Sequence, residues 1–218
     1  METLRFIMSN LPMIGERTVE HISIVSVAVG VAILVGVPTG IAITRSQRVA
    51  DTVLYLGSIV MTIPSIALFG VLIPLLSKIG QGIGYLPAVI AAMLYALLPI
   101  VRNTYTAIRN LDPALRSAAI GMGMSQSQRL LRVEIPMAMP VIIAGVRIAV
   151  VINIGVTAIA AYIGAGGLGT FISRGISQTD VRQLLTGAFT LALLAIVADS
   201  ALMYLQRRLA PKGMAVSA

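Results

Sequence analysis

The sequence predicts an all-α protein that crosses a membrane about five times, as a single transmembrane domain over residues 1–218. Of these residues 57% are hydrophobic and only 11% are charged, whereas a soluble domain has roughly 45–50% apolar and about 25% charged residues. A single core of this size cannot bury such an excess, so we expect lipid to cover it. The basic residues stand between long uncharged runs, which is typical of membrane topology. The net charge of +8 therefore does not indicate a nucleic-acid-binding face.

Each predicted span is a run long enough to cross the hydrocarbon core, which takes about 20 apolar residues as a helix. The second span contains Pro64 and Pro74, which should kink it. The fourth span starts near Pro140 and therefore contains Arg147. Its tail, Gly164–Gly169, is too rich in glycine for a regular helix, and a short re-entrant or surface element is expected around residues 168–180. The expected spans are approximately 23–44, 52–77, 81–101, 140–163 and 183–206.

The distribution of lysine and arginine orients the spans. With five spans, three loops or tails fall on one side of the membrane and carry ten basic residues, whereas the other side carries five. Because the more basic side is normally cytoplasmic, the N-terminus should lie outside and the C-terminus in the cytoplasm. The ten are Arg45, Arg48, Arg102, Arg109, Arg116, Arg129, Arg132, Arg207, Arg208 and Lys212.

The sequence lacks the residue combinations of several kinds of chemical site. The absence of cysteine excludes disulfides, thiolate metal sites and cysteine nucleophiles. His21 is the only histidine, so no metal site is expected, and we place it at the outer membrane boundary. The sequence contains no Gly-x-x-x-x-Gly-Lys-Ser/Thr loop, the motif that holds the phosphates of ATP. An intramembrane protease would need a nucleophile with its base, or two aspartates, inside the spans, and a channel would need a pore motif. The sequence shows neither arrangement, so both classes are disfavoured. We expect no catalytic residue and no cofactor in this chain.

The long basic loop over residues 109–136 carries the strongest local signals. Asp112 before Pro113 predicts a helix start, with an acceptor at the N-cap and proline at the first helical position. Ser125 with Gln128 three residues later predicts a capping box for a second short helix, which should end before Pro136. Two short helices on the cytoplasmic face are well suited to docking on a soluble partner.

This loop resembles the signature of binding-protein-dependent ABC permeases: Glu-Ala-Ala, three residues, Gly, nine residues, Ile-x-Leu-Pro. Three residues separate Ala118 and Ala119 from Gly123, and nine further residues lead to Val-Glu-Ile-Pro, which ends at Pro136. Ser117 stands where the motif has its glutamate, which puts any salt bridge from that position in doubt.

The resemblance implies a type I importer permease fold in a bacterial cytoplasmic membrane, with the loop docked in a groove of an ATPase. Ala118, Ala119 and Gly123 would allow close approach to that ATPase, and Asp112 and Arg116 would be flanking polar contacts. The implied partners are two ATP-binding subunits, which would bind the ATP, an extracytoplasmic solute-binding protein and a second permease subunit, identical or sister.

Several further strings resemble permeases of the osmoprotectant group, which import glycine betaine, carnitine, choline or proline betaine. They are Thr62–Gly70, Leu94–Tyr105, Gly121–Met124, Val151–Gly155 and Ile163–Gly169. The alternative is a permease of the same fold for another small solute, such as methionine or another amino acid.

Four polar residues within the spans are candidates for a translocation path or gate. Arg147 and Asp199 are the ionisable groups at membrane depth, where an isolated charge costs about 2.5–3.5 kcal/mol on insertion scales. They could form a structural ion pair, or Arg147 could reach the interface, or both could belong to a gate or translocation path. Asn153 and Thr157, at helical spacing, could contact a solute or hydrogen-bond another helix.

Overall fold

A computed structural model describes residues 2–210, and all regular elements in that range are helical. Short 3-10 turns follow α2 and α8, over Ile43–Arg45 and Ala160–Ile163, and a π-helical turn, Leu130–Glu134, joins α7 to α8. In chain order the α-helices are α1 (Glu2–Ser9), α2 (Leu11–Ala42), α3 (Gln47–Thr62), α4 (Ser65–Ser77), α5 (Tyr85–Arg109), α6 (Pro113–Gly121), α7 (Gln126–Arg129), α8 (Ile135–Ile159), α9 (Gly169–Ser177) and α10 (Val181–Leu209).

Among the described residues, four helical segments are long and apolar enough to cross a membrane, and α3 with α4 makes a fifth candidate. The expectation of about five spans in an all-α fold is therefore confirmed. The first segment begins at Leu11, well before the expected residue 23. The polar residues at its start belong to the same continuous helix as the apolar run. The four segments are Leu11–Arg45, Tyr85–Arg109, Gln126–Ile163 and Val181–Leu209.

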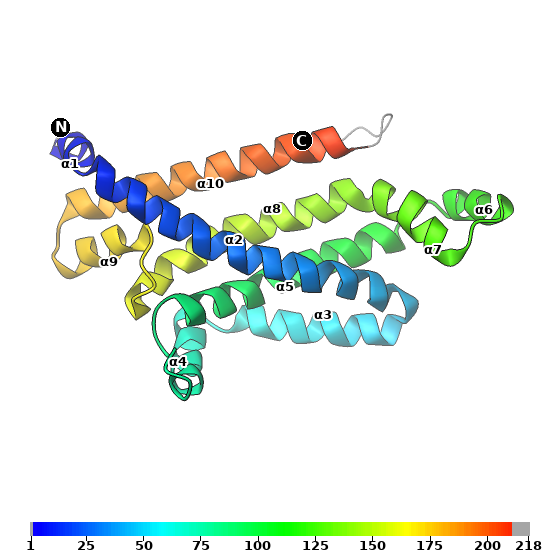
Figure 1. Ribbon diagram of the computed structural model, residues 1–218, viewed down its shortest axis with the longest axis horizontal. Helices are drawn as coiled ribbons and strands as arrows, with labels where there is room; N and C mark the ends of the chain where they lie inside the picture. Colours follow the sequence, from blue (N-terminus) through cyan, green and yellow to red (C-terminus); the bar gives the residue numbers. More distant parts are fainter. Residues whose placement is uncertain (1, 211–218) are drawn as a thin grey trace.

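The second expected span, 52–77, is broken at Pro64, where the sequence predicts a kink. Its two halves, α3 and α4, meet at 97°, and Figure 1 shows α4 turned across the long axis that α3 follows. Ile63 is extended, with φ −70° and ψ 124°, because the residue before a proline avoids the helical region. The Tyr95 hydroxyl on α5 donates to the carbonyl of Ile63. This bond satisfies a carbonyl at the break that would otherwise lack a partner in lipid.

Helix α5 lies at the centre of the bundle between α2 and α8, and small residues set the close approach of these helices (Figure 1). A Cβ added at Gly40 of α2 would lie 2.6 Å from the Thr104 Cβ of α5. A Cβ added at Gly145 of α8 would lie 2.8 Å from the Pro99 carbonyl oxygen of α5. Glycine at such contacts lets membrane helices pack backbone to backbone. By contrast, α10 covers α8 with one face and leaves Phe189 and other large apolar side chains exposed.

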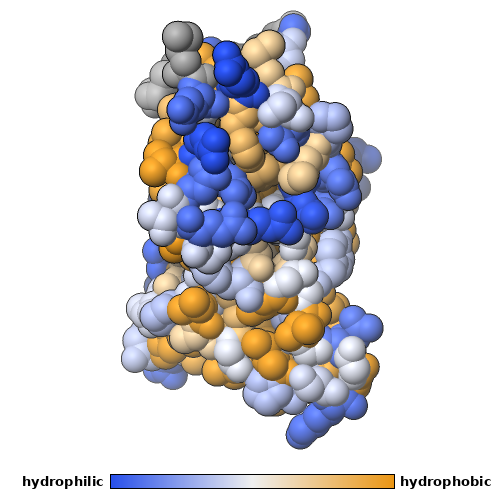
Figure 2. Space-filling view, turned by 90° about the vertical axis from the view of Figure 1, so that its left-hand side faces the viewer, coloured by the Kyte–Doolittle hydropathy of each residue, from blue (hydrophilic) through white to orange (hydrophobic). Residues whose placement is uncertain are grey.

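The two ends of the bundle differ in composition and in the elements that they carry. Helices α6 and α7 protrude at one end, whereas α1 and α9 lie at the other (Figure 1). Figure 2 looks onto the end with α1 and α9, where hydrophilic residues form a band and hydrophobic residues lie below it. At this end the Glu20 carboxylate of α2 accepts the Gly167 N–H at 2.8 Å and pairs with Arg17 at 2.8 Å.

His21 is fully buried inside the helix bundle, and its expected depth at the outer membrane boundary stays a prediction. Its Nε2 lies 3.1 Å from the carbonyl oxygen of Ile154 on α8. The glycine-rich turn after α8 covers the other side of the ring, because a Cβ at Gly167 would come 3.0 Å from His21 Nδ1. The histidine therefore joins α2 to α8 in the interior of the bundle.

Candidate functional site

Helix α6 begins as its sequence predicts. Asp112 Oδ1 accepts the backbone N–H of Ala114 at 2.8 Å, and Pro113 occupies the first turn. The helix ends at Gly121, and the turn that follows it contains Gly123, whose φ of +75° lies in the left-handed region that favours glycine. Nothing lies within 4 Å of a Cβ built there. The backbone conformation of this turn, and not internal crowding, therefore requires glycine at this motif position.

The second short helix also starts as predicted but does not end where expected. The Ser125 capping box is present, with Gln128 Oε1 accepting the Ser125 N–H at 2.9 Å. The helix does not end before Pro136: α7 continues through the π-helical turn into α8, giving one helical segment over Gln126–Ile163. Proline is tolerated here because it lies in the first turn of α8, beside a turn with altered hydrogen bonding. Helix α7 is thus continuous with a membrane span.

The two motif alanines face opposite ways. Ala119 is buried at 1% exposure, whereas Ala118 is exposed. Two large apolar side chains at the end of α6, Ile120 and Met122, are 58% and 69% exposed. Apolar side chains left uncovered on a polar loop indicate a surface for a partner. Sequence reasoning had singled out the small motif residues and overlooked these two, although an apolar residue in a loop outside the membrane is itself a signal.

Glu134 organises the loop, and its role was not predicted. Its carboxylate is 8% exposed and lies 2.9 Å from Arg129 Nε and 3.2 Å from Arg116 Nε. Arg116 also donates to the carbonyl of Ile108 at the end of α5. Arg116 was expected to contact the ATPase subunit, and in this structure its side chain contacts Glu134 and Ile108 of the same chain. One carboxylate ties α6 to α7, and Arg116 ties both to α5.

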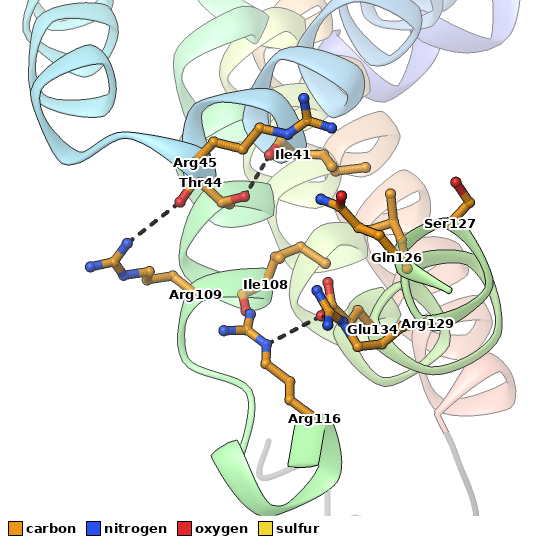
Figure 3. A pocket seen from close by; sticks show the side chains of 11 residues that line it. Ile41, Thr44, Arg45, Ile108, Arg109, Arg116, Gln126, Ser127, Arg129 and Glu134 are labelled. Atoms are coloured by element: carbon orange, nitrogen blue, oxygen red, sulfur yellow. Dashed lines mark hydrogen bonds and ion pairs between the residues drawn. The ribbon is translucent and has the colours of Figure 1, made fainter. Parts of the chain in front are cut away.

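A cavity of about 330 Å³ opens between this loop and the ends of the membrane helices. Its walls come from the ends of α2 and α5, from α6, and from the segment of α7 and the π-helical turn (Figure 3). The lining residues are Ile41, Thr44, Arg45, Ile108, Arg109, Arg116, Gln126, Ser127, Arg129, Leu130 and Glu134.

The structure brings together Arg147 and Asp199, the two ionisable residues expected at membrane depth. Arg147 donates to both carboxylate oxygens of Asp199, each at 2.9 Å, in a bidentate pair between α8 and α10. Gln206 accepts from Arg147 at 2.8 Å and donates to the Pro140 carbonyl at 2.9 Å. Arg147 of α8 thus contacts two residues of α10, and Gln206 of α10 donates back to α8. These contacts are suited to holding the two helices together.

Asn153 and Thr157 are buried, and among the described residues neither side chain forms a hydrogen bond to another helix. Asn153 Nδ2 donates to the Ala149 carbonyl of its own helix at 2.8 Å. Among the residues that the structure describes, Asn153 Oδ1 and Thr157 Oγ1 are buried without a hydrogen-bond partner. Neither side chain reaches the surface, at 0% and 1% exposure, so neither contacts a solute in this conformation.

Comparison with known proteins places this architecture in a family. Residues 32–212 match the family described as binding-protein-dependent transport system inner membrane component. The osmoprotectant import permease protein OsmW of Salmonella typhimurium is 54% identical over 98% of this chain and 100% of its own length. The choline transport system permease protein OpuBB of Bacillus subtilis is 38% identical over 97% and 95%. The carnitine transport permease protein OpuCB of Listeria monocytogenes is 43% identical over 91% and 88%.

Solved structures support the fold. An inward-facing form of the MetNI methionine ABC transporter superposes with a TM-score of 0.81 over 92% of this chain and 98% of that chain, at 24% identity. The chain belongs to the family of inner-membrane components of binding-protein-dependent transport systems, and is a multi-pass permease subunit of an ABC importer.

Proposed function

We propose that the chain carries a small quaternary-ammonium osmoprotectant, such as glycine betaine, choline or carnitine, across the cytoplasmic membrane. The observation that carries this proposal is the 54% identity, over 98% of this chain and the whole length of the relative, to a permease named for osmoprotectant import. Relatives named for choline and carnitine transport cover nearly the same residues. The likeness to a methionine transporter has only 24% identity and supports the fold alone. The alternative is a permease of the same fold for another small solute, such as methionine or another amino acid.

In this proposal the chain works with a second permease subunit, two subunits that bind and hydrolyse ATP, and an extracytoplasmic solute-binding protein. Helices α6 and α7 face the cytoplasm, the N-terminus lies outside and the C-terminus lies inside. The charge distribution supports this orientation, since Arg45, Arg109, Arg116 and Arg129 gather at the end that carries α6 and α7. Lys212, the tenth basic residue of the count, lies outside the described residues.

The contacts of the loop suggest how ATP-driven motion would reach the membrane. A displacement of α6 is passed to Glu134 through Arg116, and Glu134 lies in the helical segment that continues into α8. We infer that closure of the ATPase subunits moves α6 and α7 together and tilts α8. The solute would pass between the two permease subunits.

Uptake measurements test the substrate. The complete operon is expressed in cells that lack their own osmoprotectant uptake, and radiolabelled glycine betaine, choline, carnitine and methionine are supplied separately. Deleting this chain should abolish uptake of at least one quaternary ammonium compound, and so should an ATPase subunit that lacks its nucleotide-binding lysine. If methionine alone is taken up in an ATP-dependent manner, the substrate assignment is wrong although the permease assignment stands.

A bulky side chain on the exposed face of α6 tests the docking. Ala118→Trp should abolish the stimulation of ATP hydrolysis by loaded binding protein in reconstituted transporter. Asn110→Trp, at an exposed position just before α6, adds the same bulk outside the helix and should leave the stimulation intact. Undiminished stimulation in the Ala118 variant would contradict docking through this face.

A further inference from the structure

The cavity between the loop and the membrane helices has an unusual charge balance. Four of its lining residues are arginines, each from a different element: Arg45 from the 3-10 turn after α2, Arg109 from α5, Arg116 from α6 and Arg129 from α7 (Figure 3). Glu134 is the carboxylate among its lining residues. The residues that line the cavity therefore include four arginines and one carboxylate.

The single carboxylate is already shared by two of the four arginines. Glu134 pairs with Arg116 and Arg129. Within residues 2–210, neither Arg45 nor Arg109 has a carboxylate oxygen within 4.0 Å. Arg109 Nη1 reaches the Thr44 carbonyl oxygen at 3.5 Å, a long contact that uses one of its five donors. Two guanidinium groups thus retain donors and charge for a ligand.

Membrane topology alone places arginines at this end but does not place them around a cavity. Arg48 and Arg132 belong to the same basic end and, like Arg45 and Arg109, are exposed, yet neither lines the cavity. A hollow lined by one sign of charge concentrates the electrostatic potential more strongly than a flat surface does. Gln126, Ser127 and Thr44 add neutral polar groups to the wall, as expected of a site that orients a polar ligand.

We propose that this cavity binds a phosphate group, supplied either by an anionic phospholipid headgroup or as free inorganic phosphate. Guanidinium groups recognise phosphate with paired, charge-assisted hydrogen bonds. Arg45 and Arg109 lie at the ends of two candidate membrane spans, which is the level of lipid headgroups. The bound group would touch the membrane helices and the loop together. Its occupancy would therefore favour loop positions close to the membrane helices.

The test uses the purified transporter in detergent, with its ATPase subunits, at constant ionic strength. The probes are dioctanoyl phosphatidylglycerol, inorganic phosphate, and dioctanoylglycerol, which has the same chains without phosphate. Apparent affinity is measured from the shift of the thermal unfolding midpoint with probe concentration. Phospholipid that remains bound through purification is quantified by mass spectrometry.

The key variant is Arg45→Gln with Arg109→Gln, and its control is Arg48→Gln with Arg132→Gln, which removes the same charge outside the cavity. We expect the first pair to weaken binding of the phosphate probes roughly tenfold or more, since charge-assisted hydrogen bonds are lost. The control pair should change affinity less than about twofold. Arg45→Lys with Arg109→Lys keeps the charge and should bind with intermediate affinity; it also provides a test if the glutamine pair is unstable.

The outcomes separate the source of the phosphate from the existence of the site. Tighter binding of phosphatidylglycerol than of inorganic phosphate, with dioctanoylglycerol inactive, supports a lipid headgroup, and comparable binding of both phosphate probes supports free phosphate. Equal losses in the cavity and control pairs would show diffuse attraction and overturn the proposal. So would equal binding of dioctanoylglycerol, or the absence of binding of either phosphate probe to the assembled transporter.

Discussion

Removing one member of the Arg147–Asp199 pair should destabilise the protein more than removing both. The pair is bidentate, with two contacts of 2.9 Å. Arg147 lies twelve residues from the start of α8, about 18 Å along the helix axis. At that depth water does not solvate a charge that has lost its partner.

The expected loss of stability of each variant depends on which charge the variant leaves unpaired. Arg147→Met leaves the Asp199 carboxylate without a partner, and an unpaired charge at membrane depth costs about 2.5–3.5 kcal/mol on insertion scales. The side chains are 24% and 35% exposed, so we expect about 2–3 kcal/mol. Asp199→Leu should cost less, about 1–2 kcal/mol, since Gln206 still contacts Arg147 and a long side chain can reach the interface. The double variant is apolar and should lie within about 1 kcal/mol of the native chain.

The assay is unfolding of the purified chain in bicelles by sodium dodecyl sulfate, followed by far-ultraviolet circular dichroism, because the chain has no tryptophan. The four proteins form a double-mutant cycle, and we expect a coupling energy of about 2 kcal/mol or more. The reasoning would be refuted if the stability losses of the two single variants added up to the loss of the double variant within about 0.5 kcal/mol. Uptake by the stable double variant then identifies the pair as a brace, whereas loss of uptake without loss of stability places it in the translocation path.

Three further variants test other contacts. Gly145→Ala places a Cβ 2.8 Å from the Pro99 carbonyl oxygen and should cost roughly 1–3 kcal/mol in thermal unfolding, whereas Gly155→Ala, with nothing within 4 Å, should not destabilise; equal losses would contradict this. Glu134→Gln releases its two arginines and should speed limited tryptic cleavage of the loop, and unchanged cleavage would contradict its role. Hydrogen bonding from Arg182 lowers the pKa of Asp180 to about 2 from an ordinary value of 3.8. Because the folded pKa is depressed, the stabilisation from the ionised carboxylate is complete above pH 4 and is lost as pH falls towards 2. The thermal midpoint of Asp180→Asn should therefore fall less than that of the native chain between pH 4 and pH 2.

The helix starts of the loop were predictable because their signals are local. Asp112 and Ser125 each satisfy backbone groups within three residues, so the spacing in the chain already determines the contact. The pairing of Arg147 with Asp199 was predictable for a different reason. Few charges lie at membrane depth, which leaves few possible partners.

The features that sequence reasoning missed depend on contacts between distant segments. Pro64 signals a disturbed helix, but the 97° break depends on packing and on Tyr95, which reaches Ile63 from another helix. His21 is polar and close to charged residues, yet a turn far along the chain covers it. Pro136 is compatible with either the end or the first turn of a helix, and only the continuity with α7 decides between them.

Because α7 is continuous with α8, a single long helical segment runs from the loop across the bundle. The segment Gln126–Ile163 has 38 residues, about 57 Å at 1.5 Å per residue. Its two internal prolines lie near the loop, so bending is concentrated there and the remainder can rotate as a stiff rod. A tilt of about 10° of the part beyond Pro140, about 35 Å long, would carry the far end through about 6 Å, to where α2 holds the glycine-rich turn. A modest push at the loop is thereby magnified on the opposite side of the membrane.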